Sequence, residues 1–339
     1  MLAVVLGLGL PIPGCTGGSS AAPKARSTVA AHWVRDVHVP GVVDLTGPRS
    51  DGQIVVAASG HLDLLDRSGR LTPFASGDTG YATALGSEPY IALSPAATFG
   101  AAGCTFGRDT VYAIEPGTAP GVIRVDTQAR RFASLPGVAP NGIAFDDVGR
   151  FGYRLLVTAA TQSDTVVFAI DCAGRVATIT SHAPAVEGGI AVAPASFGSF
   201  AGDLIAPDEK SGQVWAISPD GQSRLVARSP LPSGGDIGVE SVAFVPPGFG
   251  TQWVAYVADR VTPGNAHPGT DSILRMSGND LAKSGARAGD LIIASEAGAQ
   301  TIVIRCTSAC TTRPIGEGPA TSHVEGHVMV AQRAPGDRL

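Results

Sequence analysis

The sequence predicts an all-β fold, a six-bladed β-propeller of four-stranded antiparallel blades whose ring is closed by the C-terminal strand. Two repeated elements predict it. A polar residue heading a short apolar run recurs five times, and a pair of β-rich runs recurs six times. Elements that recur every few tens of residues indicate repeated structural units, and four-stranded sheets repeated around a ring form a propeller. The 44 Gly and 25 Pro residues supply the frequent turns that many short strands need.

The first repeated element is expected to form the innermost strand of a blade. Its clearest copy is residues 140–146, in which Asn141 stands directly before an apolar run. In the other copies a carboxylate replaces the amide, at Glu88, Glu187, Glu240 and Glu325. Innermost strands of a propeller line one central channel, so residues at equivalent positions converge on its axis. We therefore expect these five side chains to face one another across a narrow channel.

The second repeated element is expected to supply two adjacent strands of each blade. Apolar and polar residues alternate inside its runs, as is typical of β-strands, and turn residues separate them. Runs at residues 70–74 and 224–227 follow two of the pairs and supply an outer strand. The six pairs are 53–58 with 61–66, 111–114 with 122–126, 155–158 with 166–171, 203–206 with 213–217, 255–258 with 272–276, and 290–294 with 301–305.

Closure of the ring is the least regular part of the pattern. The run after Glu325 follows the sixth pair, whereas the first pair, near Ile54, has no obvious polar-headed run before it. We therefore expect the C-terminal strand to complete the first blade, and the second to fifth pairs to join the polar-headed runs that precede them. The sixth pair is then left without a clear innermost strand. Residues 33–39 would then contribute elsewhere in the ring. Seven blades, or one irregular blade, form the alternative.

The N-terminal residues resemble an export signal. Residues 2–10 are apolar and precede small residues, a pattern typical of a secretory signal and too short for a mature membrane span. Small residues directly before Cys15 resemble a bacterial lipobox, which implies cleavage and lipid attachment at Cys15. We expect a signal peptide at 1–14, a flexible lipidated tether at 15–31 and a propeller domain at 32–339, held at the extracytoplasmic face of the cell membrane. The alternative is a plain secreted or disordered N-terminus, since Pro13 is unusual there and no Lys or Arg precedes the apolar run.

Four further cysteines remain, and in an exported protein an even number favours disulfides. Three pairings are formally open. Cys306 and Cys310 are spaced to close across a tight hairpin, which would leave Cys104 with Cys172. A Cys-x3-Cys metal site is the rival interpretation, but no second Cys/His pair at zinc spacing accompanies it.

The charge of the chain narrows its partners. The formal net charge is -5, and no basic face is visible in the sequence, which argues against a nucleic-acid binder. We expect a monomer that binds a small molecule at the channel mouth and touches a membrane only through the N-terminal lipid.

The repeated elements also carry a resemblance to a known superfamily. Residues 140–146 with 155–158, the segment 187–189 and the turn 219–221 are similar to six-bladed propellers of the gluconolactonase, regucalcin and paraoxonase type. In that superfamily an Asn of a Pro-Asn-Gly element and acidic residues of other blades hold a divalent ion, usually calcium. Only Asn141 carries over by a matching motif. Thr46 stands where the superfamily has a Glu before Gly-Pro, and Asp236 is a candidate for its late Asp.

The chemistry of the predicted channel points independently to a cation. Carboxylates crowded together repel and lose hydration, which raises their pKa values unless a positive charge neutralises them. A hard divalent cation with oxygen ligands, calcium before zinc, meets that need. The other interpretation is that these residues bond turn backbones or channel water. Charged residues that end second strands, such as Glu209 and Arg260, are expected to be solvated.

Two histidines flank the last predicted ligand. In a strand His323, Glu325 and His327 share one face, where a histidine offers a nitrogen ligand or a general base. A zinc-protease motif does not fit, because that motif needs Glu directly after the first His on a helix, and Gly326 interrupts here.

Three functions follow from these residues. The first is a metal-dependent hydrolase of a lactone or ester, with Glu187, His323 and His327 as catalytic candidates. The second is a ligand-binding lipoprotein without turnover. The third is a scaffold propeller that binds another protein of the cell envelope.

Overall fold

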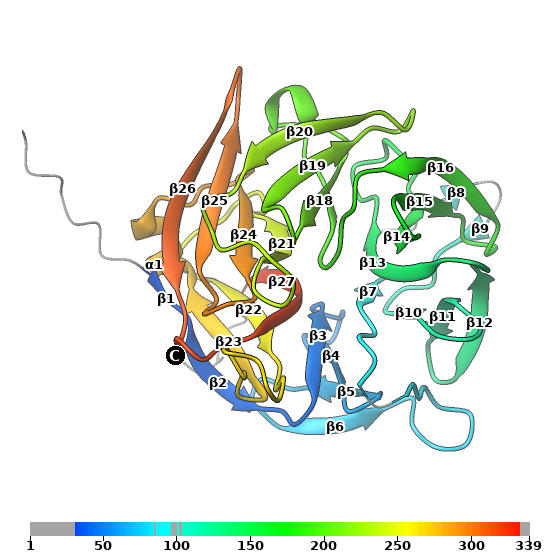
Figure 1. Ribbon diagram of the computed structural model, residues 1–339. Coiled ribbons are helices and arrows are strands. Elements are labelled where there is room, and N and C mark those ends of the chain that lie inside the picture. Colours follow the sequence, from blue (N-terminus) through cyan, green and yellow to red (C-terminus); the bar gives the residue numbers. More distant parts are fainter. Residues whose placement is uncertain (1–30, 85, 96–99, 102–103, 333–339) are drawn as a thin grey trace, which may run out of the picture.

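The structure is a computed structural model that describes residues 31–84, 86–95, 100–101 and 104–332. Six four-stranded antiparallel sheets stand around a common axis, which confirms the predicted propeller (Figure 1). The predicted signal peptide, Cys15 and residues 16–30 of the predicted tether lie outside the described residues. Within the described ranges no helix is long and apolar enough to cross a membrane.

The first four blades follow one another along the chain, each running from an innermost to an outermost strand. The first blade is β3 (Val42–Thr46), β4 (Ile54–Ala58), β5 (His61–Leu65) and β6 (Leu71–Phe74). The second is β7 (Ile91–Leu93), β10 (Val111–Glu115), β11 (Gly121–Val125) and β12 (Ala129–Ser134). The third is β13 (Ala139–Phe145), β14 (Leu155–Ala160), β15 (Thr165–Ile170) and β16 (Val176–Ala183). The fourth is β17 (Ala191–Val192), β18 (Leu204–Asp208), β19 (Gln213–Ile217) and β20 (Ser223–Arg228).

The last two blades are interleaved along the chain. The fifth is β21 (Val239–Phe244), β24 (Leu291–Ser295), β25 (Thr301–Cys306) and β26 (Cys310–Glu317), with β1 (Ala31–His32) added in parallel to β26. The sixth is β27 (Val324–Gln332), β22 (Trp253–Asp259), β23 (Ser272–Ser277) and β2 (Val34–His38). The chain therefore starts the fifth blade, builds two strands of the sixth, and returns through α1 (Gly278–Ser284). Two short pieces, the hairpin of β8 (Gly100–Ala101) with β9 (Cys104–Thr105) and the helical turn η1 (Gly198–Phe200), complete the elements.

This topology corrects two expectations about closure. The C-terminal strand closes the ring, but β27 completes the sixth blade, because it pairs with β22. The first blade has an innermost strand of its own, β3, which the sequence pattern did not reveal since it lacks the polar head. Likewise β21 pairs with β24, not with the pair that follows it directly. Residues 33–39 do contribute elsewhere, as β2 at the outer edge of the sixth blade.

The predicted six pairs of β-rich runs are the two middle strands of the six blades. These strands are buried because neighbouring blades pack face to face on both of their sides; every residue of β24 is buried, whereas most of the outer strand β16 is exposed. Aromatic rings fill part of the layer between the second and third blades, where Phe106, Tyr112 and Phe145 stand edge to face.

Both disulfides that the cysteine spacing suggested are formed. Cys306 and Cys310 close the hairpin of β25 and β26, and Cys104 joins Cys172. The second bond ties the β8–β9 hairpin of the second blade to the turn that follows β15 in the third. These bonds leave no cysteine pair for the rival metal site among the described residues.

A buried carboxylate holds several blades together at the axis. Asp44 is fully buried; its Oδ1 accepts the backbone N–H groups of Leu45 and His327, both at 2.8 Å, and its Oδ2 accepts that of Ile91 at 2.7 Å. His327 adds Nδ1 to Asp44 at 2.9 Å and Nε2 to the Ile143 carbonyl at 2.9 Å. Burial disfavours the charged imidazole, but the Asp44 carboxylate and these hydrogen bonds raise the pKa of His327. First, second, third and sixth blades thus meet at one ion pair.

We predict that Asp44→Asn lowers the free energy of unfolding in urea by about 3 kcal/mol, because breaking a buried ion pair strands the remaining charge. The amide NH2 of the variant would also face backbone N–H groups that in the wild type donate to the Asp44 carboxylate. Asp66→Asn is the control, since that carboxylate bonds only its own exposed turn through Ser68 and Arg70. Equal losses in the two variants would show that the axial ion pair adds no special stability.

Candidate functional site

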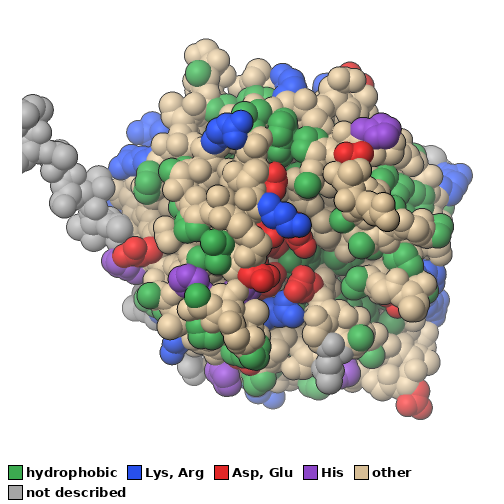
Figure 2. All heavy atoms as spheres, viewed as in Figure 1, with side chains coloured by type: hydrophobic (Ala, Val, Ile, Leu, Met, Phe, Trp, Pro, Cys, Tyr) green, Lys and Arg blue, Asp and Glu red, His purple; other side chains and the backbone are tan. Residues whose placement is uncertain are grey.

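The polar starts of the innermost strands meet the ends of the second strands at one rim of the ring. Because the strands are antiparallel, Val239 of β21 lies opposite Ser295 of β24, and Val324 of β27 opposite Asp259 of β22. A residue directly after a second strand therefore enters the same channel as the polar residue that heads an innermost strand. In the space-filling view, acidic side chains with a few basic ones gather at the centre of this face (Figure 2).

Residues at the ends of second strands correct the expectation that they are solvated. Glu209 follows β18, Arg260 follows β22 and Glu296 follows β24, and all three are held in the channel. Glu209 and Glu296 are buried, and the Arg260 side chain is 16% exposed. Their position after a strand, at the rim where the polar heads converge, was the signal available in the sequence.

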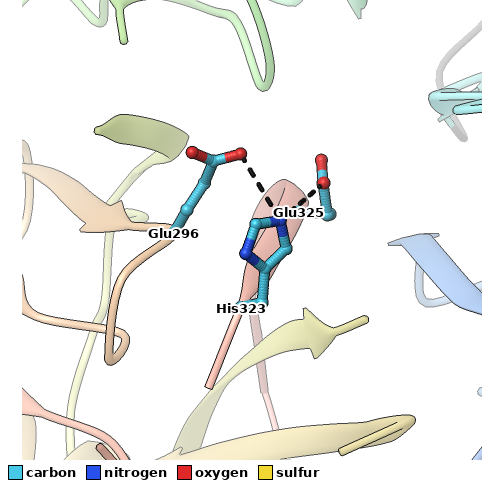
Figure 3. Close-up of side chains that lie close together, drawn as sticks. All are labelled: Glu296, His323 and Glu325. Atoms are coloured by element: carbon cyan, nitrogen blue, oxygen red, sulfur yellow. Dashed lines mark ion pairs between the residues drawn. The ribbon is translucent and has the colours of Figure 1, made fainter. Parts of the chain in front are cut away.

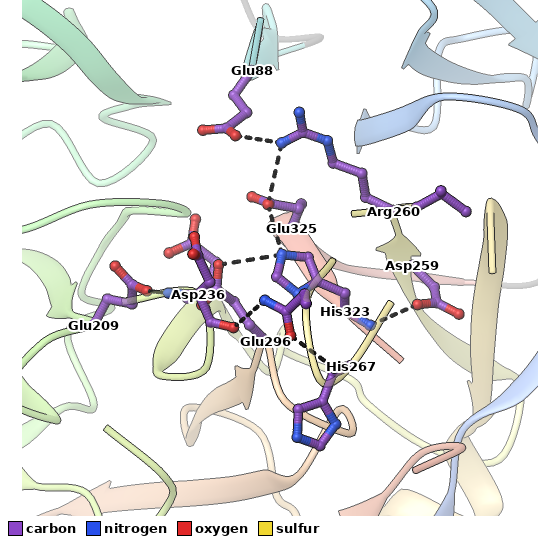
Figure 4. A network of polar contacts seen from close by, with 12 residues as sticks. Glu88, Glu209, Asp236, Asp259, Arg260, His267, Glu296, His323 and Glu325 are labelled. Carbon is purple, nitrogen blue, oxygen red and sulfur yellow. Dashed lines mark hydrogen bonds and ion pairs between the residues drawn. The ribbon is translucent and has the colours of Figure 1, made fainter. Parts of the chain in front are cut away.

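Arg260 gathers two of the predicted ligands. Its Nη1 donates to Glu88 of the second blade and lies 3.3 Å from Oε1 of Glu325 in the sixth (Figure 4). Its Nη2 donates to the carbonyl of Gly86 at 3.3 Å. Burial works against the charge of the guanidinium, but the two carboxylates raise the pKa of Arg260. On this side of the channel the Arg260 guanidinium therefore supplies a positive charge.

Tyr90 shares Glu325 with Arg260 and also contacts Glu240. Its hydroxyl lies 2.7 Å from Oε1 of Glu240 and 2.9 Å from Oε2 of Glu325. One hydroxyl carries one hydrogen, so it cannot donate to both carboxylates at once. Burial and the neighbouring carboxylates raise the pKa of Tyr90, which keeps the phenol protonated. Glu240, which is 1% exposed, has a raised pKa for the same reasons, burial first and Glu325 second.

Asn141 and Glu187 lie on the other side of the channel. Asn141 donates its Nδ2 to the Val186 carbonyl at 2.7 Å, while its Oδ1 is buried and has no partner among the described residues. Burial and then the carboxylates of Glu209, Glu88 and Glu325 raise the pKa of Glu187 to about 7. Neither side chain meets Arg260 in a hydrogen bond or ion pair within the described structure.

These two residues open onto a cavity of about 850 Å³. Glu88, Tyr90, Asn141 and Glu187 line its inner part, and the walls are made mostly of small residues from the second and third blades. A cavity of this size accommodates a small organic molecule, with its reacting part next to the acidic channel.

The two predicted histidines have different surroundings. His323, which is 1% exposed, places Nε2 3.3 Å from Oε1 of Glu325 and 3.7 Å from Oε1 of Glu296 (Figure 3). Its Nδ1 is buried without a partner in the described part of the chain. His327 does not share this arrangement, contrary to the expected common strand face. A bulge in β27 with Gly326 at φ +67° breaks the alternation, so both ring nitrogens of His327 are taken up by Asp44 and Ile143.

A further acidic group adjoins His323. Glu209 accepts the backbone N–H of Asp236, and its carboxylate lies within 4.8 Å of that of Glu296. Burial, followed by the charges of Glu240, Glu325 and Glu209, raises the pKa of Glu296 far above its usual range. The sequence had offered Asp236 as a candidate, but it gave Glu209 and Glu296 no role.

The loop of residues 261–271 lies over this group. Asn265 donates its Nδ2 to the Asp236 carbonyl at 3.1 Å, and the Nδ1 of His267 is 2.7 Å from the Ala320 carbonyl (Figure 4). The loop begins directly after Arg260 and reaches Asp236 through Asn265, so it connects the guanidinium with the second acidic group.

Two comparisons of the sequence found no match for this chain. No protein family profile matches it, and no curated protein matches it.

Comparison of structures returns other β-propellers. A calcium-binding protein, regucalcin, from Agrobacterium tumefaciens is 13% identical over 86% of this chain and 79% of its own, with a TM-score of 0.48. Virginiamycin B lyase from Staphylococcus aureus is 13% identical over 86% of this chain and 92% of its own, with a TM-score of 0.44. A gluconolactonase from Xanthomonas campestris is 15% identical over 68% of this chain and 69% of its own, with a TM-score of 0.42. With TM-scores below 0.5 these matches carry no argument about this chain; its fold rests on its own sheet topology, and its site on its own residues.

Proposed function

We propose that this protein binds a divalent cation in the acidic channel and hydrolyses a lactone or ester in the adjoining cavity. The observation that carries the proposal is a set of buried polar atoms that face a crowd of carboxyl groups and have no partner in the described residues. The set consists of Asn141 Oδ1, Glu240 Oε2 and Glu296 Oε2. Buried polar atoms of proteins are almost always paired, so such a concentration fits a bound cation.

The residues that would hold the cation are Glu296, His323 and Glu325, whose ligand atoms lie within 4.8 Å of one another. Asn141 and Glu240 offer further oxygens at the same rim. An oxygen-rich set suits calcium, and the imidazole nitrogen also admits manganese or zinc. A divalent cation there would polarise a substrate carbonyl and stabilise the negative charge that develops on its oxygen.

Glu187 is the residue best suited to activate water. It lines the cavity, and a pKa of about 7 means that it accepts a proton near neutral pH and can return it to a leaving alcohol. Asn141, on the same wall, has no proton to exchange and offers its free Oδ1 to orient a water or a ligand. His323 is buried between two carboxylates and does not line the cavity. Its role would therefore be that of a metal ligand.

Binding without turnover is the second candidate function, and Arg260 favours it. Its guanidinium already neutralises part of the charge of Glu88 and Glu325, so the channel is not wholly dependent on a metal ion. The cavity would then hold a small molecule through the same residues, with no need for a base.

We further propose that the protein is exported and anchored by lipid at Cys15. The two disulfides support this, because such bonds persist in oxidising compartments. In a bacterial host the full chain should fractionate with membranes and Cys15→Ser should be released into the soluble extracytoplasmic fraction. Identical fractionation of both proteins would contradict the anchor.

Changing Glu187 tests the hydrolase directly. We predict that Glu187→Gln lowers kcat for hydrolysis of lactone or aryl-ester substrates by roughly 100-fold or more, because a general base contributes about that much. In the wild type kcat should rise with pH around a midpoint near 7, the pKa of Glu187, and the variant should lose this dependence.

The matched control is Glu115→Gln, because Glu115 lines the outer part of the same cavity and is paired with Arg131. Its kcat and pH profile should equal those of the wild type. A wild type that turns over none of these substrates but binds a lactone would favour binding without turnover.

Without a bound metal, the stability of the folded protein should depend on pH. Glu187, Glu240 and Glu296 have pKa values raised above 4.5, so their favourable contribution to stability is complete below that value and is lost as pH rises through the folded-state values. In chelator, the melting temperature should therefore fall between about pH 5 and pH 8. At the higher pH, adding calcium or manganese at about 100 times Kd should restore roughly 2.7 kcal/mol of stability. A melting temperature that responds to neither pH nor cation would contradict the site.

A further inference from the structure

We propose that the acidic channel holds two divalent cations, with the carboxylate of Glu296 shared between them. The inference deepens the proposed function and rests on it, since it concerns the same channel. One cation would lie among Glu296, His323 and Glu325, and the second among Glu209, Asp236 and Glu296.

The two sets of ligand atoms lie next to each other and have one residue in common. Within each set, one ligand atom per residue lies within 4.8 Å of those of the other two, a spacing that one ion can bridge. Glu296 belongs to both sets, and its carboxylate stands between His323 on one side and Glu209 on the other (Figure 4). Two sets that share a carboxylate would place two ions side by side, as in two-metal sites.

An unpartnered buried atom gives the second step. Glu296 is 5% exposed and turns Oε1 toward His323, whereas its Oε2 has no partner in the described part of the chain (Figure 3). A single ion beside His323 would leave this second oxygen facing the carboxylate of Glu209. Two carboxylates at this spacing repel each other, and a cation between them would remove that repulsion.

The carboxyl groups at the channel outnumber its positive groups. The positive groups at the channel are the Arg260 guanidinium, already bonded to Glu88 and Glu325, and the Lys210 ammonium near Glu187. The acidic groups that remain are more numerous than one divalent ion can neutralise. They are Glu187, Glu209, Asp236, Glu240 and Glu296.

The donor atoms predict which ions fit. The set with Glu209 and Asp236 offers oxygens alone and suits calcium, magnesium or manganese. The set with His323 adds a nitrogen and suits manganese or zinc. Manganese(II) is accepted by both kinds of ligand, and it is paramagnetic, so it is the probe of choice.

The test counts manganese ions per chain in the full, metal-stripped protein by calorimetric titration and elemental analysis. The wild type should bind two, and its electron paramagnetic resonance spectrum should show spin coupling between ions that share a carboxylate. Asp236→Asn and Glu209→Gln should each bind one and lose the coupling. Asparagine tolerates the left-handed backbone at position 236 (φ +61°), and glutamine keeps an acceptor for the Asp236 N–H, so both variants should fold.

Asp208→Asn is the matched control, since this neighbour of Glu209 bonds only its own turn at Lys210 and Ser211. It should bind two ions with unchanged coupling. One uncoupled ion in the wild type, unaffected by Glu209→Gln, would overturn the paired site and leave the proposed function standing. No bound ion at all would overturn the proposed function itself. Two ions that persist in both Asp236→Asn and Glu209→Gln would show that these residues are not the ligands.

Discussion

Convergence of carboxylates from different blades on one axis is the constraint on which the rest of this structure depends. Each polar head is harmless in its own blade, but the ring brings the heads together in a volume with little water. Like charges at such separations cost several kcal/mol when poorly screened. The channel must therefore supply compensating charge, and its composition is best understood as the response to that requirement.

The two sides of the channel respond differently. Near Glu88 and Glu325 the compensation is internal, through the Arg260 guanidinium and the Tyr90 hydroxyl. Asn141, Glu240 and Glu296 each have one buried oxygen without a partner among the described residues, and Asn141 lines the cavity beside Glu187. Buried oxygens without a partner are rare in proteins, and these are the observation on which the proposed cation site rests.

Interleaving of the fifth and sixth blades is what completes this site. Because β22 pairs with β27, the residue after β22, Arg260, lies beside Glu325. Because β24 pairs with β21, the residue after β24, Glu296, lies near Glu240. The Asp44–His327 pair then fixes β27 against the first and third blades. Closure of the ring and assembly of the site thus use the same strand, so a loosened β27 would disturb both His323 and Glu325.

The sequence by itself determined the fold class, the six pairs of middle strands, five of the innermost strands and the convergence of their polar heads. These features depend on local periodicity and on ring symmetry, and both can be recognised from repeats in the sequence. Only the tertiary structure decided which runs share a blade, because alternation says nothing about partners when apolar strands are interchangeable. It also decided that His327 turns to Asp44, through a bulge at Gly326, and that Glu209, Arg260 and Glu296 enter the channel. A charged residue after a strand has the same local sequence whether it is exposed to solvent or buried in the central channel. Its burial is decided by neighbouring residues from other blades.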